Sequence, residues 1–298
     1  MIGELAALGA ALSWTISAML YRKALQQTKP ISANIVRLSC TSAILLVFLV
    51  AIAKLGVPTS LQPEIVALAA ISGVIGLGLG DTLYMVSLKL IGVARAVPIT
   101  CTYPLFNLVW AIFLIGEKVT LPLVLGAVII VLGIWLLSHE KENHKEEGQS
   151  KLLFKGIAAA LATAVLWSVS IAMMDMAVKN TPSPDDAFVI NTVRVATIAA
   201  LLLALSPMID RERNFLRMKR TTVAILIIGG IIALGIGWFF LAYSFITIPE
   251  SQAVPISSTT PLFSTLVGVT LLREKVTARN VIGSIVIVVG IFLVFLVR

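Results

Sequence analysis

The stretch that decides the fold is AVPITCTYPLF, residues 96–106, because a close copy of it occurs later in the chain. The copy is AVPISSTTPLF, residues 253–263, so the two stretches are 157 residues apart. Both are largely apolar, and both carry two prolines at matching positions. Because proline lacks a backbone hydrogen-bond donor, each stretch is predicted to lie in an interrupted helix.

Further matches at the same offset indicate that the chain is a duplicated unit. They are Asn34/Asn191, Arg37/Arg194, Gly78/Gly235, Gly80/Gly237, Gly126/Gly283, Gly133/Gly290 and the segments EKVT at 117–120 and 274–277. So many ungapped matches do not arise from composition alone. Internal repeats in a hydrophobic chain are typical of transporters.

The composition is that of an integral membrane protein. Hydrophobic residues make up 58% of the chain and charged residues 13%, with a mean hydropathy of +1.01. A soluble domain has roughly 25% charged residues. The net charge of +8 does not indicate a nucleic-acid partner, since the basic residues lie at the ends of apolar runs. Cys40 and Cys101 lie inside apolar runs, so neither a disulfide framework nor a metal site is expected.

Apolar runs of about 20 residues, enough to cross a ~30 Å bilayer core, predict ten helical spans. They cover residues 2–21, 31–53, 64–88, 93–115, 120–138, 152–178, 185–206, 221–245, 250–272 and 277–297. The polar stretch 139–151 is predicted to be a solvated linker between a first repeat, 1–138, and a second, 152–298. The pair His139 and His144 is not expected to bind a metal, because nothing else there supplies good ligand geometry. The first span has no basic segment before it, so we expect it to stay in the mature protein.

Five spans per repeat predict that the second repeat crosses the membrane in the opposite orientation to the first. The fold class is therefore an all-α integral membrane protein of two inverted five-helix repeats around a central cavity. Of the 23 lysines and arginines, 17 follow odd-numbered spans, four lie on the opposite side, and Arg37 and Arg194 lie inside spans. The positive-inside rule then predicts a multi-pass protein of the cell membrane with a cytoplasmic linker and non-cytoplasmic termini.

The chain contains two tandem five-helix units, and each has Asn-x-x-Arg in its second helix and a proline-interrupted fourth helix followed by Glu-Lys. In this it resembles the drug/metabolite transporter superfamily. Within it the chain is similar to the ten-helix EamA-type members, over nearly its whole length. The resemblance implies a cavity lined by the first, third and fourth helices of each half. It also implies export of amino acids or other metabolites, while related branches carry sugar phosphates or nucleotide sugars.

Matching polar stripes on the fourth and ninth spans are the first candidates for the substrate site. The stripes contain Thr100, Tyr103 and Asn107, and Ser257, Thr260 and Ser264. At 100° per residue each set falls on one helix face, which should point into the bundle rather than toward lipid. The alternative is helix packing by interhelical hydrogen bonds. The repeated prolines favour a cavity, where an interrupted backbone is tolerated at membrane depth.

Aromatic residues and two serines of the first, third, sixth and eighth spans add to the predicted substrate site. The candidates are Trp14, Ser17, Tyr84, Trp167, Ser170 and Trp238. Trp14 and Trp167 lie half-way along their spans, too deep for an interfacial belt. They therefore either pack against other helices or form aromatic walls of a ligand site. Glycines beside Tyr84 and their counterparts in the eighth span are expected to allow close helix packing.

Asp81 is the candidate for proton coupling, because a carboxylate inside an apolar span is costly and by default functional. Its repeat counterpart is Trp238, so the second half has no matching acid. The alternatives are a side chain that reaches the interface or one that pairs with Arg95.

Arg37 and Arg194 occur in both halves, each with an asparagine one turn away, Asn34 and Asn191. A central arginine costs roughly 2.5–3.5 kcal/mol on insertion scales and therefore needs partners. Because the arginine is present in both repeats, a structural role is favoured, with anion binding as the alternative.

The predicted function is a secondary transporter that moves a small amino acid-like metabolite by alternating access, with proton coupling as an option. One alternative is an anion carrier that uses Arg37 and Arg194, and another is a structural or sensory membrane protein. No catalytic pair, metal site or cofactor motif is visible, so an enzyme is not expected. The expected partners are a small-molecule substrate and the lipid bilayer, with no nucleic acid, and the expected oligomeric state is a monomer.

Overall fold

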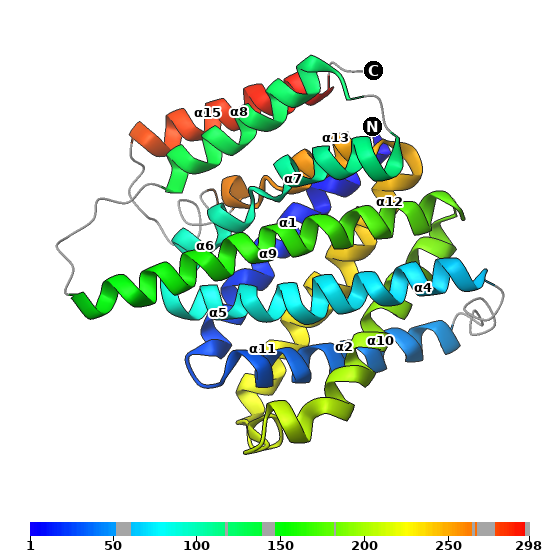
Figure 1. The fold of residues 1–298 in the computed structure, drawn as a ribbon, viewed down its shortest axis with the longest axis vertical. Helices are drawn as coiled ribbons and strands as arrows, with labels where there is room; N and C mark the ends of the chain where they lie inside the picture. The colour runs from blue at the N-terminus through cyan, green and yellow to red at the C-terminus, as the bar shows by residue number, and fades with distance from the viewer. Residues whose placement is uncertain are drawn as a thin grey trace.

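The computed structural model describes residues 1–51, 61–116, 119–138, 147–181, 183–263, 266 and 278–295 (Figure 1). The described residues are helices and their connections, with no strand among them. Most of the linker and Ser264 lie outside this part of the chain. Of the two EKVT segments, only Val119 and Thr120 lie inside it. Residues 147–151, predicted as linker, instead form the first turns of a long helix.

The first repeat contains α1 (Ile2–Leu25), α2 (Pro30–Ala51), α4 (Pro63–Ser72), η1 (Gly73–Gly80), α5 (Asp81–Ile91), α6 (Val93–Thr100), α7 (Tyr103–Trp110), η2 (Ala111–Ile115) and α8 (Leu121–Ser138). The second contains α9 (Glu147–Lys179), α10 (Pro184–Ile209), η3 (Asn214–Leu216), α11 (Arg220–Gly230), η4 (Ile231–Gly237), α12 (Trp238–Thr247), α13 (Glu250–Ser257) and α15 (Ala278–Phe295). Turn chemistry separates them: Gly92 and Gly116 end α5 and η2 with positive φ, where L side chains are strained.

Seven helical stretches of the described chain are long and apolar enough to cross a membrane. They match the first, second, third, fourth, sixth, seventh and eighth predicted spans. Shorter apolar segments, Leu121–Leu136 and Ile285–Val294, lie where the fifth and tenth spans were predicted. The ninth predicted span contains α13, and most of its residues after 263 lie outside the described part.

The proline-rich repeats interrupt their helices as predicted. α6 ends at Thr100 and α7 begins at Tyr103, with Pro104 in the first turn of α7. In the second half α13 ends at Ser257, and the helix resumes at residue 260, just before Pro261. Pro104 and Pro261 have no N–H to continue the preceding helix, which explains breaks at matching positions.

Both glycine-rich ridges are π-helical, which the sequence did not predict. η1 spans Gly73–Gly80 and η4 spans Ile231–Gly237, so the two segments coincide at the repeat offset apart from one residue. π-helical turns of this kind occur often at functional sites. The residues that follow them, Asp81 and Trp238, both face the cavity described below.

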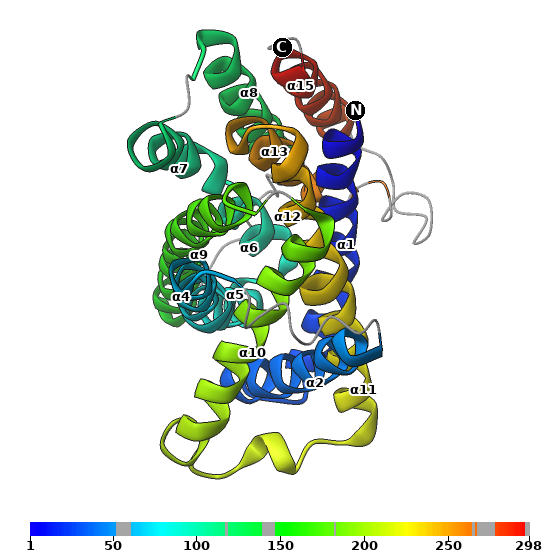
Figure 2. The same cartoon turned by 90° about the vertical axis from the view of Figure 1, so that its right-hand side faces the viewer.

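The helices form a bundle in which the two repeats interlock. α5 lies along α9 on one side, and α1 lies along α12 on the other (Figure 2). α8 and α15 pair with each other at one edge of the bundle (Figure 1). Their backbones approach closely, because a methyl group at Gly133 would lie 2.8 Å from the backbone nitrogen of Ile287.

Candidate substrate-binding cavity

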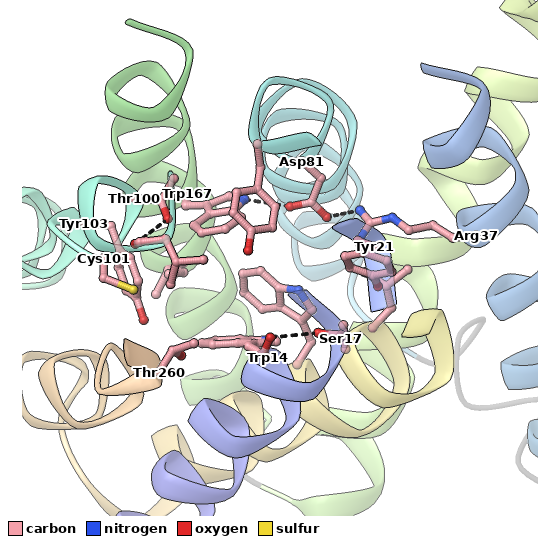
Figure 3. A pocket seen from close by; sticks show the side chains of 16 residues that line it. Trp14, Ser17, Tyr21, Arg37, Asp81, Thr100, Cys101, Tyr103, Trp167 and Thr260 are labelled. Atoms are coloured by element: carbon pink, nitrogen blue, oxygen red, sulfur yellow. Dashed lines mark hydrogen bonds and ion pairs between the residues drawn. The ribbon is translucent and has the colours of Figure 1, made fainter. Parts of the chain in front are cut away.

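A cavity lies between the α5–α9 pair and the α1–α12 pair, and both repeats contribute to it (Figure 3). It is lined by Trp14, Ser17, Tyr21, Arg37, Asp81, Tyr84, Val97, Thr100, Cys101, Tyr103, Trp167, Ile171, Ala233, Leu234, Trp238 and Thr260. The space open to the centre of a water molecule is about 50 Å³. Because one water needs about 10–15 Å³ on this measure, the cavity takes several waters or one small polar molecule.

The structure brings most of the predicted substrate residues together in this cavity. Eight of them line it: Trp14, Ser17, Tyr84, Thr100, Tyr103, Trp167, Trp238 and Thr260. Arg37 and Asp81 line it as well. Asn107, Ser170 and Ser257 are not among the lining residues, and Ser264 lies outside the described part of the chain.

Asp81 is buried, with 3% of its surface exposed, and it receives bonds from two other helices. Its Oδ2 pairs with the guanidinium of Arg37 on α2, and its Oδ1 accepts a hydrogen bond of 2.7 Å from Nε1 of Trp167 on α9. The partner is therefore Arg37, rather than the Arg95 that the sequence offered as an alternative. Asp81 thus links α5 to α2 of its own repeat and to α9 of the other, and its charge is compensated inside the bundle.

Arg37 is held by a set of contacts that fixes its guanidinium at the cavity wall. Its Nε donates to Oδ1 of Asn34 over 2.9 Å, as the one-turn spacing predicted. The guanidinium carbon lies 4.9 Å from the centroid of the Tyr21 ring. Asn34 in turn donates to the carbonyl of Leu77 and to the hydroxyl of Thr82, over 3.0 and 2.8 Å. Arg37 can therefore be structural and still present charge to a ligand.

Arg194 is fully buried at the matching position but has different partners. Its Nε donates to Ser72 Oγ over 2.9 Å, its Nη2 to Ser170 Oγ over 3.1 Å, and its Nη1 to Met174 Sδ over 2.7 Å. Its guanidinium carbon lies 4.3 Å from the centroid of the Trp238 ring. No carboxylate pairs with it among the described residues. Asn191 bonds to the carbonyl of Leu234, over 2.7 Å, rather than to Arg194.

Some of the predicted stripe residues close the bundle rather than line the cavity. Ser257 exchanges a hydrogen bond of 2.9 Å with the hydroxyl of Tyr103, and Asn107 donates to the carboxylate of Glu250 and to the carbonyl of Ser168. These bonds join α7 to α13 and α9. For Asn107 and Ser257 the packing alternative therefore describes their contacts, whereas Tyr103 both packs and lines the cavity.

Sequence reasoning missed several residues around the site. Val97, Cys101, Ile171 and Leu234 line the cavity but are apolar or weakly polar, so nothing distinguishes them from core residues. Glu250 is completely buried, yet it begins a helix and therefore resembles an interfacial residue in the sequence. Among the described residues no group of three or more His, Cys, Asp or Glu side chains could hold a metal ion.

Comparisons with known proteins give one family model, two relatives named as transporters and one solved structure with the same fold. The sequence model of the EamA-like transporter family matches residues 1–139 and 154–296. An uncharacterized transporter of Archaeoglobus fulgidus is 27% identical over 297 residues, which is 99% of each chain. An uncharacterized transporter of Clostridium kluyveri is 21% identical over 226 residues, covering 74% of this chain and 69% of that protein. A crystal structure with 20% identity superimposes with a TM-score of 0.76 over 99% of this chain and 96% of its own, which shows a shared fold.

Proposed function

This chain belongs to the EamA-like transporter family, and from that premise we propose that it exports a small zwitterionic, amino acid-like metabolite by alternating access. The proposed architecture has ten spans in two inverted repeats, in the cell membrane, with the cavity between the repeats as the substrate site. The residues proposed to contact the substrate are those of the cavity wall, with Asp81 as the site of proton coupling.

The observation that carries the proposal is the Arg37–Asp81 ion pair in the cavity wall. The two groups have opposite charges and lie side by side, so the carboxylate of a zwitterion can pair with Arg37 while its ammonium pairs with Asp81. Aromatic rings and hydroxyls supply the rest of the lining. A cavity of this size suits a small metabolite rather than a large one such as a nucleotide sugar.

Proton coupling follows from the position of Asp81. A carboxylate that exchanges partners within a cavity can release Arg37 when it takes up a proton, and it can also lose its bond to Trp167 on α9. Protonation would then weaken a contact between the two repeats. Coupling by Asp81 therefore connects its charge state to the separation of α5 from α9.

A second candidate is a carrier of anionic metabolites such as sugar phosphates, and the environment of Arg194 favours it. Two arginines and one aspartate leave an excess positive charge near the cavity among the described residues. An anion would compensate that charge. The zwitterion remains the stronger candidate, because Arg194 is covered by Trp238 and is not itself part of the lining.

The test is a thermal-shift screen of the purified protein against small neutral amino acids, sugar phosphates and organic cations. We expect neutral amino acids to raise the unfolding temperature of the wild type, and the Asp81→Asn variant to keep part of this shift, because its amide oxygen still accepts a hydrogen bond from the ammonium group. Stabilisation by sugar phosphates alone would replace the proposal by the anion carrier. If no compound stabilises the protein, a structural or sensory role becomes the better account.

The proposed topology has a cytoplasmic linker and non-cytoplasmic termini, from the 17 to four distribution of basic residues. A reporter that is active only in the cytoplasm should be active when inserted at residue 145 and silent when fused after Arg298. The reverse pattern would invert the orientation of the whole bundle.

A further inference from the structure

Asp81 and Trp238 occupy matching positions of the two repeats but carry different chemistry. Each is the first residue after a π-helical segment, η1 or η4, and each lines the cavity. Each also meets the same two kinds of partner: the arginine of the second span of its own repeat, and a tryptophan from the first span of the other repeat. The duplicated bundle has therefore kept a common frame of arginine and tryptophan around two positions that differ.

The tryptophans of this frame are seated in matching ways. A methyl group at Gly80 would lie 2.9 Å from Cδ1 of Trp167, and one at Gly237 would lie 2.8 Å from Nε1 of Trp14. Both distances are too short for a side chain, so glycine at each position is what lets the ring approach. The two rings are thus fixed against η1 and η4 before any ligand binds.

The two positions give the cavity a charged region and an aromatic region. At Asp81 the carboxylate accepts bonds from Arg37 and Trp167, and Tyr21 stacks on Arg37. At Trp238 the ring instead lies 5.3 Å from the Trp14 ring, edge to face, with Ala233 and Leu234 also in the lining. Trp14 and Tyr21 are seven residues apart on α1, two turns or about 10 Å along the helix axis. The aromatic region is therefore displaced from the charged one.

Arg194 decides which group of a ligand each region can accept. Its guanidinium lies over the Trp238 ring, so a second cation on that ring would meet a like charge. The ammonium group is thus directed to Asp81, the acid of the cavity lining. An uncharged, apolar group has no such penalty beside Trp14 and Trp238.

We infer that the cavity holds its substrate in one orientation, with an ammonium group at Asp81 and an apolar side group against Trp14 and Trp238. The substrate class is then an amphipathic amine, such as a neutral amino acid with an apolar side chain, and Trp238 is a specificity-determining residue. The inference rests on the proposed transport function and deepens it. It goes beyond that function because it assigns the apolar side group of the substrate to Trp14 and Trp238.

The experiment compares four probes by calorimetric titration of the purified protein: glycine, leucine, 3-methylbutylamine and 4-methylpentanoate. Wild type should bind leucine at least about tenfold more tightly than glycine, since even one methylene group in an apolar pocket is worth about tenfold or more. It should also bind 3-methylbutylamine more tightly than 4-methylpentanoate, because the amine keeps the group that Asp81 recognises. These comparisons need no variant.

Variants then assign the side group to the aromatic region. Trp238→Ala should lower leucine affinity about tenfold and leave glycine affinity unchanged, whereas Trp238→Phe, which keeps a ring over Arg194, should retain the preference. Ala233→Leu, which fills the same region, should exclude leucine but not glycine. Trp135→Ala, at an exposed ring outside the cavity, is the matched control and should change neither.

The outcomes separate this inference from the proposed function. Equal binding of glycine and leucine by wild type would overturn the inference and leave a zwitterion carrier standing. So would an equal loss of both ligands in folded Trp238→Ala. Binding of none of the four probes would overturn the proposed substrate class together with the inference.

Discussion

At the scale of single residues, the sequence identified the charged groups that are costly to bury in a membrane span, but not how they pair. Asp81 and Arg37 stand out as charges inside apolar spans, yet they are 44 positions apart, and only the packing of α5 on α2 brings them together. The Arg37–Asn34 bond was predictable, because the two residues are one helical turn apart. The equivalent bond in the second half does not form, since Asn191 bonds to a carbonyl of η4. Local spacing therefore predicts contacts within a helix, and contacts between helices need the fold.

The first prediction concerns the stability that the buried pair supplies. Arg37→Ala should lower the free energy of unfolding by about 3–5 kcal/mol, because it leaves the Asp81 carboxylate buried without a counter-charge. The double variant Arg37→Met with Asp81→Asn should recover most of this loss, since neither charge then remains. Thermal denaturation in detergent measures both, with the exposed Lys151→Ala as control. Equal destabilisation by the single and double variants would show that the pair does not act as a unit.

At the scale of elements, apolar runs predicted the helices well, because about 20 apolar residues suffice to define a span. The second predicted span, 31–53, compares with α2 at Pro30–Ala51. The breaks beside Pro104 and Pro261 were also predicted, since proline removes a backbone donor at a known position. The π-helical segments η1 and η4 were not, because a glycine-rich apolar run is compatible with either helix type. The early start of α9, at Glu147, was missed because its first turns are polar.

The second prediction distinguishes the two roles within the polar stripes of the fourth and ninth predicted spans. In a background without Cys40 and Cys101, cysteine at Thr100, Tyr103 or Thr260 should react with a small water-soluble thiol reagent, because these positions line the cavity. Cysteine at Asn107 or Ser257 should react more slowly, because those positions are packed against neighbouring helices and do not line the cavity. Labelling followed by mass spectrometry gives the rates. The same rate at all five positions would contradict this division.

The third prediction concerns the loop after α10, where Asp210 fastens the loop to α2. Burial of its carboxylate opposes ionisation, but hydrogen bonds from Asn214, the Phe215 amide and Ser32 outweigh it, so the pKa of Asp210 lies below its ordinary value. A depressed pKa contributes stability that is present at neutral pH and is lost as the pH falls below about 4.

Asp210→Asn should therefore lower the unfolding temperature at pH 7 and flatten its decline below about pH 4. Unfolding temperatures measured from pH 3 to pH 7 test this, with Glu64→Gln, an exposed carboxyl at the start of α4, as the control. Parallel profiles for Asp210→Asn and wild type would contradict the assigned role of the hydrogen bonds.

At the scale of the whole molecule, the duplication explains both what recurs and what differs. The interrupted helices, the π-helical ridges and the buried arginines recur at matching positions. The acid does not, because Trp238 stands where the first repeat has Asp81. A coupling site within one repeat is compatible with alternating access, in which both repeats move around a shared cavity. The repeat, and with it the membrane class, could be predicted from the sequence. The contact of Asp81 and Tyr84 on α5 with Trp167 on α9 could not, because it joins helices of different repeats.

The most direct test of the central claim uses proteoliposomes that contain either wild type or Asp81→Asn. Two quantities are measured for a neutral amino acid that binds: its exchange between equal pools, and its accumulation when a pH gradient is imposed. Both proteins should exchange the substrate, because Asp81→Asn keeps the shape and polarity of the site. Wild type should also concentrate it, and Asp81→Asn should not, since that variant has no carboxylate to carry a proton. Accumulation by Asp81→Asn equal to that of wild type would contradict the role of Asp81 in coupling.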